Sequence, residues 1–253
     1  MTRELHDRET DRVKTGSRPQ NPVRAVVFDA VGTIITPNSP VSTVYQAAIE
    51  KHCGIRHTTE FLGTALRDAL TRRSRQTSLQ TNEAIEYRFW EELIRDLCNG
   101  HPQTEACFDD LYEQFGQPQN WSVFEDVADC LIDLQTNDLS LAVASNFDHR
   151  LHSVLNGLLE VKSLTTRFVS SEIGFRKPAA EFFSAVCQQL GLPPAEVLFI
   201  GDDLTNDIQG ATDAGCSAVW IDRRQQLCPE SVRRVARLTE VAALLGSRSG
   251  VET

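Results

Sequence analysis

The chain has 253 residues, of which 41% are hydrophobic and 24% are charged, so it is long enough for one large globular domain or for a domain that carries an insertion. Its formal net charge is −10, which argues against binding to nucleic acid or to an anionic membrane surface. No stretch of the sequence reaches the length of a membrane-spanning segment. These properties favour a protein that acts on a small molecule.

The two ends of the chain are expected to be unstructured. Residues 1–22 have mixed charge and few apolar side chains, and they lack the apolar segment of a signal peptide. Residues 247–253 are expected to form a flexible tail. We therefore assign no catalytic role to either end.

The cysteines indicate a reducing environment. There are seven of them, an odd number, and no two form a CxxC pair. Most fall within apolar helical patterns, where a thiol acts as a small core residue. We therefore expect a cytoplasmic protein without a disulfide framework, and zinc ligation is the less favoured interpretation.

Five short β-like runs recur along the chain, and several are continuously apolar, as expected of strands buried on both faces of a parallel sheet. From the second run onward, helical patterns separate them. This alternation predicts an α/β fold with a doubly wound, Rossmann-like parallel sheet. The runs cover residues 24–28, 140–144, 167–169, 197–200 and 218–221.

The long segment between the first two runs contains no convincing strand and shows apolar stripes at helical spacing instead. Three such stripes lie within residues 61–70, 85–97 and 108–115. We therefore expect an all-helical insertion over residues 39–119, between core segments 23–38 and 120–246. A further helix over about residues 124–134 is expected to return the chain to the sheet.

Polar side chains lie at or just after the ends of four predicted strands. Asp29 follows the first strand, Ser145 and Asn146 follow the second, and Asp202-Asp203 follows the fourth, while Lys177 comes a few residues after the third. In an open α/β sheet, ligands bind beyond the carboxyl ends of the strands, so the topology should bring all four groups to one rim. Individually, these residues also fit helix caps and surface charges.

Together, these side chains suit phosphoryl transfer. A few carboxylates, a backbone carbonyl and water are ligands that Mg²⁺ prefers, and a carboxylate beside Mg²⁺ can act as a nucleophile. Lys177 can neutralise charge, while the Ser145 hydroxyl and the Asn146 amide can bind phosphate oxygens. Carboxylates crowded at one rim repel one another unless a cation neutralises them, which favours a site over a set of unrelated caps.

The chain resembles a known family at these positions. The motifs "FDAVGT", "ASN", "GFRKP" and "GDDLTND" resemble, in order, the four motifs of the haloacid dehalogenase-like (HAD) hydrolases, over about residues 24–222. The helical insertion resembles the C1-type cap of that family. The wording "SNFDHRL" followed by "GFRKP" is most similar to the subgroup of haloacid dehalogenase-like hydrolase domain-containing protein 3.

The resemblance implies Asp29 as the nucleophile, Lys177 as the charge neutraliser and Asp202 as a metal ligand. It further implies a Mg²⁺ site formed by Asp29, Asp202 and the backbone carbonyl of Val31. The resemblance also implies that the transferred group is surrounded by four residues, Thr33, Ser145, Asn146 and Lys177. It further implies that Asp203 or Asp207 binds the metal through water or orients Lys177.

The sequence departs from the family at Val31. Phosphatases of this family usually carry a second Asp at this position, where it protonates the leaving alkoxide. A general acid typically contributes about 10²–10⁴-fold, so its absence should slow the hydrolysis of simple alkyl phosphates by that order. Substrates whose leaving group needs no proton should be affected least.

Three functions are compatible with Val31. The first is a Mg²⁺-dependent phosphatase for a small phosphorylated metabolite that is slow, prefers acyl or aryl phosphates, or takes its acid from the cap. The second is a carbon–halogen hydrolase. Two observations oppose it: such enzymes need no metal, whereas "GDDLTND" keeps the acidic metal-type motif, and residues 30–49 contain no Arg to hold halide. The third is a weakly active or inactive ligand-binding or regulatory protein.

Two features of the insertion bear on this choice. A phosphonatase-like enzyme needs a lysine in the cap that forms a Schiff base, and Lys51 is the only lysine there, so this function is a minor possibility. The basic run "TRRSRQ" at residues 71–76 suits an anionic substrate, but solvated surface is the favoured interpretation.

Overall fold

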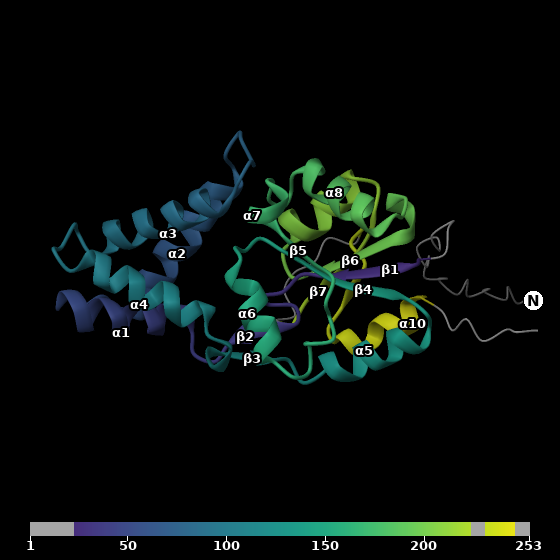
Figure 1. Cartoon of the computed structure of the whole chain (residues 1–253), viewed down its shortest axis with the longest axis horizontal. Coiled ribbons are helices and arrows are strands. Elements are labelled where there is room, and N and C mark those ends of the chain that lie inside the picture. Colours follow the sequence, from purple (N-terminus) through teal and green to yellow (C-terminus); the bar gives the residue numbers. More distant parts are fainter. Residues whose placement is uncertain (1–22, 224–230, 246–253) are drawn as a thin grey trace, which may run out of the picture.

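The computed structural model describes residues 23–223 and 231–245, so the tails expected at 1–22 and 247–253 lie outside the described residues. A parallel sheet of six strands, in the order β5-β4-β1-β6-β7-β8, forms its centre (Figure 1). The prediction of an α/β fold is confirmed. The sixth strand, β8, was not predicted, because its two residues are too few to show periodicity. The strands are β1 Ala25–Phe28, β4 Ser140–Ser145, β5 Arg167–Val169, β6 Val197–Gly201, β7 Ser217–Ile221 and β8 Arg234–Val235.

Strand β1 lies between β4 and β6, and this position determines where the first motif sits. Phe28, the last residue of β1, pairs with Val143 on one side and with Ile200 on the other. All four residues of β1 are fully buried, as their apolar side chains require. The peptide N–H of Asp29 still donates to the carbonyl of Ile200 at 2.8 Å, so Asp29 stands at the middle of the carboxyl rim.

Helices cover both faces of the sheet, as the alternation of its side chains dictates. Val26 and Phe28 belong to a hydrophobic cluster that includes residues of α5 and α6, whereas Val27 belongs to a second cluster with Phe182 and Phe183 of α8. Figure 1 places α8 on one side of the sheet and α5 and α10 on the other. The core helices are α5 Val127–Thr136, α6 Arg150–Gly157, α7 Ser170–Ile173, α8 Ala180–Leu190, α9 Gly210–Asp213 and α10 Val241–Leu245.

Four α-helices between β2 (Ile35–Pro37) and β3 (Trp121–Val123) form a separate body beside the sheet (Figure 1). They have a hydrophobic cluster of their own, to which Ile49, Leu62, Ile94 and Leu111 contribute buried side chains. We refer to this body as the cap. Its helices are α1 Val41–Cys53, α2 Thr59–Ser74, α3 Glu83–Leu97 and α4 Thr104–Gly116.

Two short strands join the cap to the core, and the sequence did not reveal them. β2 (Ile35–Pro37) pairs antiparallel with β3 (Trp121–Val123), so the interpretation of this long segment as free of strands was wrong. Three residues are too few to show an alternating pattern. The strands pair because the chain leaves for the cap and returns from it at neighbouring points, which a single sequence does not display.

The cap also contacts the core at the start of α6. The guanidinium carbon of Arg150 lies 3.5 Å from the centre of the Tyr112 ring on α4, and its Nη1 donates to the Tyr112 carbonyl at 2.7 Å. A second contact begins at α3, where Glu83 accepts hydrogen bonds from the backbone N–H of His149 at 3.0 Å and from the Ser171 hydroxyl. These contacts hold α3 and α4 against the core.

The basic run at residues 71–76 is divided between two environments. Arg72 and Arg75 are exposed, as expected, but Arg73 is buried, so the surface interpretation was wrong for that residue. Arg73 donates to both carboxylate oxygens of Glu86 at 2.8 and 2.6 Å and lies 4.1 Å from the centre of the Phe89 ring. The helical rotation of α2 turns this one arginine toward α3.

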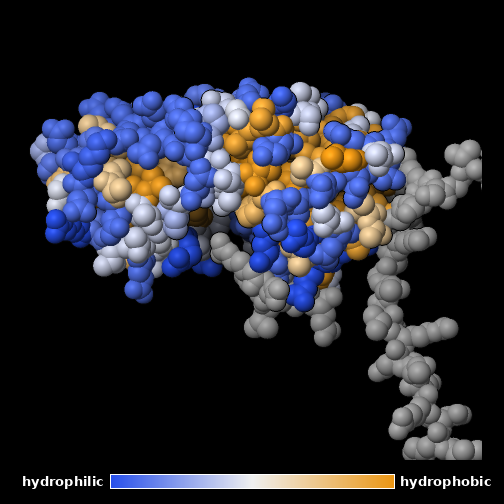
Figure 2. All heavy atoms as spheres, turned by 90° about the horizontal axis from the view of Figure 1, so that it is seen from below, coloured by the Kyte–Doolittle hydropathy of each residue, from blue (hydrophilic) through white to orange (hydrophobic). Residues whose placement is uncertain are grey.

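The face of the molecule in Figure 2 is mostly hydrophilic over the cap, whereas apolar residues are more frequent over the half that contains the sheet. Within the described residues, no helix combines the length and hydropathy that crossing a membrane requires. The hydrophilic exterior of the cap is consistent with helices that bury their apolar side chains among themselves.

Replacing Arg73 with Met should destabilise the protein by about 3–5 kcal/mol, because the carboxylate of Glu86 would remain buried without its partner. Arg72→Met, on the exposed face of the same helix turn, should change the free energy of unfolding by less than about 0.5 kcal/mol. Chemical denaturation of both variants measures these values. Equal stability of the two variants would contradict the proposed weight of the buried pair.

Candidate functional site

The loop after β1 forms a tight turn around Asp29. The carbonyl of Ala30 accepts hydrogen bonds from the N–H groups of Ile34 and Ile35, both at 2.9 Å, and Gly32 donates to the Ile35 carbonyl at 2.8 Å. Gly32 has φ +88°, and a Cβ at this position would lie 2.3 Å from Oδ2 of Asp202. The glycine therefore permits both the turn and the close approach of the fourth motif.

Lys177 is at the centre of the site rather than on the surface. Its side chain is 2% exposed, and Nζ donates to Asp29 Oδ1 at 2.6 Å, to Asp207 Oδ1 at 2.5 Å and to the Ala144 carbonyl at 2.9 Å. Burial by itself disfavours the ammonium ion, but the charges of Asp207 and Asp29 outweigh it and raise the pKa of Lys177 above its ordinary value. The lysine is therefore held as a cation between two carboxylates.

Asn146 holds the backbone at Lys177. Its Oδ1 accepts from the backbone N–H of Lys177 at 2.8 Å, and its Nδ2 donates to the Lys177 carbonyl at 3.0 Å. This paired arrangement fixes the loop that carries Lys177 and uses both polar atoms of the amide. The geometry supports a positioning role for Asn146 more directly than the phosphate contact that its motif implied.

Ser145 and Thr33 flank Asp29 in different ways. The Ser145 hydroxyl donates to Asp29 Oδ1 at 3.2 Å, so Ser145 is in direct contact with the carboxylate. The Thr33 hydroxyl is buried and, among the described residues, has no hydrogen-bond partner. A buried hydroxyl is costly to leave unpaired, so Thr33 is a suitable donor for a bound anion.

The fourth motif contributes two aspartates with different tasks. Asp207 contacts Lys177, and its Oδ2 accepts from the backbone N–H of Asp203 at 3.1 Å. Asp203 instead caps the helical turn Leu204–Gln209, with Oδ1 accepting from the N–H groups of Thr205 and Asn206 at 2.8 and 2.9 Å. Of the two alternatives for orienting Lys177, the contacts therefore select Asp207.

Gly201 allows Asp207 to reach this position. A Cβ on Gly201 would lie 2.2 Å from Cγ of Asp207, a distance that no side chain can tolerate. Strand β6 therefore ends in glycine because the carboxylate of Asp207 packs against its backbone. The same Asp207 is 3% exposed, so its negative charge depends on Lys177.

Three carboxylates converge at this rim. Oxygen atoms of Asp29, Asp202 and Asp207 all lie within 4.8 Å of one another. Removal from water, followed by repulsion from Asp29, raises the pKa of Asp207 to about 7 despite the attraction of Lys177. Asp202 is exposed as a whole residue, but desolvation of its carboxylate, followed by repulsion from Asp29 and Asp207, raises its pKa to about 8.

The raised pKa values indicate that one lysine does not compensate the charge of three carboxylates. Within the described residues, Asp202 forms no hydrogen bond with Lys177, and its carboxylate faces Gly32 and the two other acids. A hard divalent cation with oxygen ligands would remove the repulsion. The chemistry of this donor set therefore fits Mg²⁺.

Sequence reasoning missed Arg223, which follows β7 at the same rim. Its Nη2 donates to the Thr33 carbonyl at 2.7 Å, and the guanidinium pairs with both carboxylate oxygens of Asp126 at 3.0 Å. Arg223 thus ties the loop after β1 to the start of α5. The rule that selected the other strand ends applies to β7 as well, and it would have selected Arg223.

Trp220 was also missed. Its indole N–H donates to the carbonyl of Asp202 at 2.9 Å, and the side chain is fully buried on β7. The contact holds the backbone of Asp202 where the carboxylate faces Asp29. A tryptophan in an apolar strand looks like an ordinary core residue, so no pattern in the sequence singles it out.

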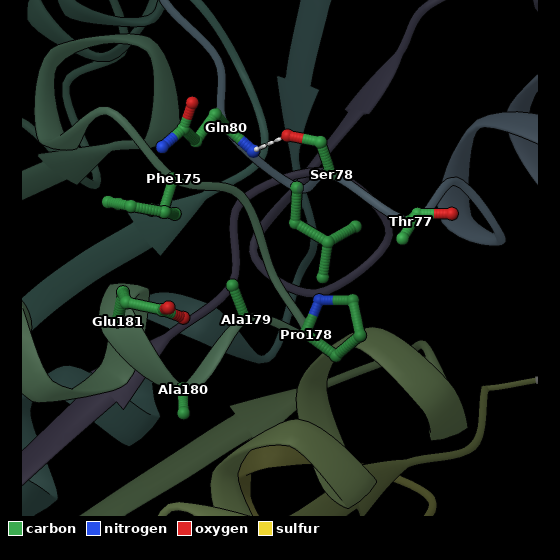
Figure 3. Close-up of a pocket in the computed structure, with 9 residues that line it drawn as sticks. Thr77, Ser78, Gln80, Phe175, Pro178, Ala179, Ala180 and Glu181 are labelled. Carbon is green, nitrogen blue, oxygen red and sulfur yellow. Dashed lines mark hydrogen bonds between the residues drawn. The ribbon is translucent and has the colours of Figure 1, made fainter.

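A cavity of about 580 Å³ lies beside the Lys177 loop, where the cap meets the core. In Figure 3 the segment Thr77–Gln80 of the cap lines one side, and Phe175 and Pro178–Glu181 line the other. Arg176 fastens the two sides together, because its Nη2 donates to the Arg73 carbonyl at 2.7 Å and to Gln76 Oε1 at 2.9 Å. The catalytic candidates do not line this cavity, so the chemistry is located elsewhere on the rim.

Comparison with known proteins gives one family. The model for the family described as "Hydrolase: haloacid dehalogenase-like hydrolase" matches residues 23–215. The chain is 25% identical over 210 residues to haloacid dehalogenase-like hydrolase domain-containing protein 3 of Danio rerio, covering 80% of this chain and 86% of that protein. The family that the motifs indicated is therefore confirmed, and the chain is similar to the subgroup that the wording of the motifs indicated.

Two further similarities involve characterised activities. The chain is 28% identical over 170 residues to human N-acylneuraminate-9-phosphatase, covering 62% of this chain and 66% of that protein. L-2-haloacid dehalogenase from Xanthobacter autotrophicus has a similar structure, with a TM-score of 0.68 and 20% sequence identity over 88% of this chain and 98% of that one. At this identity the structural likeness supports the fold alone.

The stability of the protein without metal should fall as the pH rises from about 4 to 8, the interval between the ordinary pKa of Asp202 and its value in the folded state. In that interval the folded state binds more protons than the unfolded state, so raising the pH favours unfolding. Asp202→Asn should flatten this decline and should be more stable than the parent protein at pH 8 in EDTA.

Thermal unfolding in EDTA across this pH range measures the effect, with Asp68→Asn on the exposed face of α2 as the control. Mg²⁺ should raise the melting temperature of the parent protein and of the control. It should raise the melting temperature of Asp202→Asn much less. An unchanged pH slope in Asp202→Asn would contradict the idea that carboxylate repulsion destabilises the rim.

Proposed function

Because the chain belongs to the haloacid dehalogenase-like hydrolase family, we propose that it is a Mg²⁺-dependent phosphatase that acts on a small phosphorylated metabolite through a phosphorylated Asp29. The observation that carries this proposal is the convergence of three carboxylates, whose oxygen atoms lie within 4.8 Å of one another and two of which contact one buried lysine. A relative named as a phosphatase, at 28% identity, supports the same choice.

Asp29 is suited to be the nucleophile. Lys177 and Ser145 both donate to its Oδ1, so Oδ2 is the atom that we assign to attack phosphorus. In the first step the bond from Oδ2 to phosphorus forms, and the bond from phosphorus to the leaving oxygen breaks. Water then attacks the phosphorus of the acyl phosphate, which releases inorganic phosphate and restores the carboxylate.

The other residues of the rim compensate charge and position groups. Lys177 and the hydroxyls of Thr33 and Ser145 would stabilise the transferred phosphoryl group, since phosphoryl transfer depends mainly on positioning and charge compensation. Asp29, Asp202 and the Val31 carbonyl would hold Mg²⁺, with Asp207 orienting Lys177. When bound, the ion supplies neutralisation of the carboxylates and of the phosphate oxygens.

Val31 determines which phosphates we expect as substrates. Its side chain is a hydrocarbon without an ionisable group, so it offers no proton to a leaving group. It is half-buried and packs against the main hydrophobic cluster. An alkoxide leaving group needs that proton, whereas a carboxylate or a phenolate leaves more readily without it. We therefore expect acyl or aryl phosphates to be hydrolysed faster than alkyl phosphates.

Val31 also keeps carbon–halogen hydrolysis as the second candidate, because halide leaves without a proton. Asp29 Oδ2 would then attack carbon, and water would hydrolyse the resulting ester. The three clustered carboxylates oppose this alternative, since this reaction needs no cation to offset their repulsion. A regulatory protein that binds a ligand without turnover would retain the rim for binding alone.

With Mg²⁺, the purified protein should hydrolyse an aryl phosphate, and Asp29→Asn should abolish turnover because the amide is not a nucleophile. Release of inorganic phosphate from p-nitrophenyl phosphate measures this, with Asp68→Asn as the control. Turnover that survives Asp29→Asn would overturn the assignment of the nucleophile. Halide release from a 2-haloacid without metal would favour the second candidate.

Val31→Asp should raise the rate on alkyl phosphates by about 10²–10⁴-fold, because it supplies the general acid. The gain on an acyl phosphate should be much smaller, since that leaving group needs no proton. The ratio of kcat/KM values for the two substrates, measured for both proteins, tests the idea. An equal gain on both substrates would contradict a role in protonating the leaving group.

A further inference from the structure

Three cysteines that are far apart in the sequence meet inside the cap. Cys53 is the last residue of α1, Cys98 directly follows α3, and Cys107 lies in α4. Their sulfur atoms all lie within 4.8 Å of one another, and the residues are 8%, 0% and 0% exposed. We call these residues the cap thiol cluster.

The spacing of the sulfurs suits a single soft ion. Three sulfurs bound at about 2.3 Å to one centre lie about 4 Å apart when the centre is in their plane, and closer when it is not. The sulfurs of the cap thiol cluster lie within 4.8 Å of one another, so small shifts of the side chains would bring them to this separation. Since each sulfur comes from a different helix, a bound centre would connect α1, α3 and α4.

The surroundings of the cluster select the charge of its ligand. The three cysteines belong to the hydrophobic cluster of the cap, together with Leu97 and Phe108. Three thiolates bound to a monovalent ion carry a net charge of minus two, and those bound to a divalent ion carry minus one. A trivalent centre leaves no net charge, and only that product avoids burying an unpaired charge among apolar side chains.

We propose that the cap thiol cluster is a binding site for a trivalent thiophilic metalloid, of which arsenous acid is the representative ligand. Three S–H bonds and three As–OH bonds break, three As–S bonds form, and three water molecules leave, with no change in oxidation state. Soft thiolate ligands favour such a centre. The site lies in the cap and does not depend on the proposed hydrolase function.

The cluster differs from the other thiol pair in the described part of the chain. The sulfurs of Cys187 and Cys216 lie 3.7 Å apart in the core, and they provide two ligands. Arsenic bound to that pair would retain one hydroxyl group. The two sites are therefore distinguished by mass: the cluster gains one arsenic and loses three hydrogens, whereas the pair gains an As–OH group and loses two hydrogens.

Native mass spectrometry of the reduced full chain with sodium arsenite tests the proposal. We expect one arsenic per chain with the loss of three hydrogens, and a higher melting temperature because three helices become connected. Cys107→Ser should lower the affinity for arsenite by about tenfold or more, which corresponds to about 1.4 kcal/mol. Cys130→Ser, a buried cysteine outside the cluster, should leave the affinity unchanged.

Three results would overturn the proposal. One is the absence of binding to the folded parent chain at stoichiometric arsenite. Another is a product that retains a hydroxyl group and disappears in Cys187→Ser, which would place the arsenic on the core pair. The third is a chain that does not bind arsenite but binds Cd²⁺ through three sulfurs, as detected by X-ray absorption. This result would refute the argument from charge. Since the mass is measured on the parent chain, the result does not depend on the folding of a variant.

Discussion

The contact of the Lys177 ammonium with Asp29 and Asp207 is the interaction on which the rest of the site depends. Nζ lies 2.6 and 2.5 Å from the two carboxylates, and all three side chains are buried. None of these charges is tolerable alone at this depth, so each requires the others. The lysine that we propose to compensate charge during the reaction is thus the same group that allows the carboxylates to be buried.

Several residues around the rim allow Lys177 and the carboxylates to lie this close together. Gly201 and Gly32 leave room for the carboxylates of Asp207 and Asp202, where any Cβ would overlap them. Asn146 fixes the peptide groups of Lys177 through two hydrogen bonds, and Arg223 holds the carbonyl of Thr33. The motifs are therefore parts of one packed arrangement, and a change at a glycine or at Arg223 acts indirectly on the carboxylates of the rim.

The cap has an organisation of its own, with a separate apolar cluster and a buried pair between Arg73 and Glu86. It is joined to the core by β2 and β3 and by the contacts of Arg150 and Glu83. The carbonyl of Arg73 also accepts from Arg176, one residue before Lys177. The segment that carries Lys177 is thus in contact with the cap, so the position of the cap and the position of Lys177 are physically connected.

Sequence patterns were sufficient for the parallel sheet and for the grouping of Asp29, Ser145, Lys177 and Asp202 at one rim, because strand order and direction bring the carboxyl ends of parallel strands together. They were insufficient for β2 and β3, whose three residues show no periodicity. Arg73 was misjudged for a related reason, since its burial depends on the rotation of α2 toward Glu86 and not on the composition of the run.

The sequence by itself determined which chemical groups are available: a carboxylate after the first strand, a lysine, an acidic fourth motif and a valine where an acid is usual. Only the tertiary structure decided how they are divided among tasks. It assigned Asp207 to Lys177, Asp203 to a helix cap and Asn146 to the lysine backbone, and it gathered Cys53, Cys98 and Cys107 in the cap. The reason is physical: a side chain's type fixes its chemistry, but its partners depend on distances between segments that are remote in the chain.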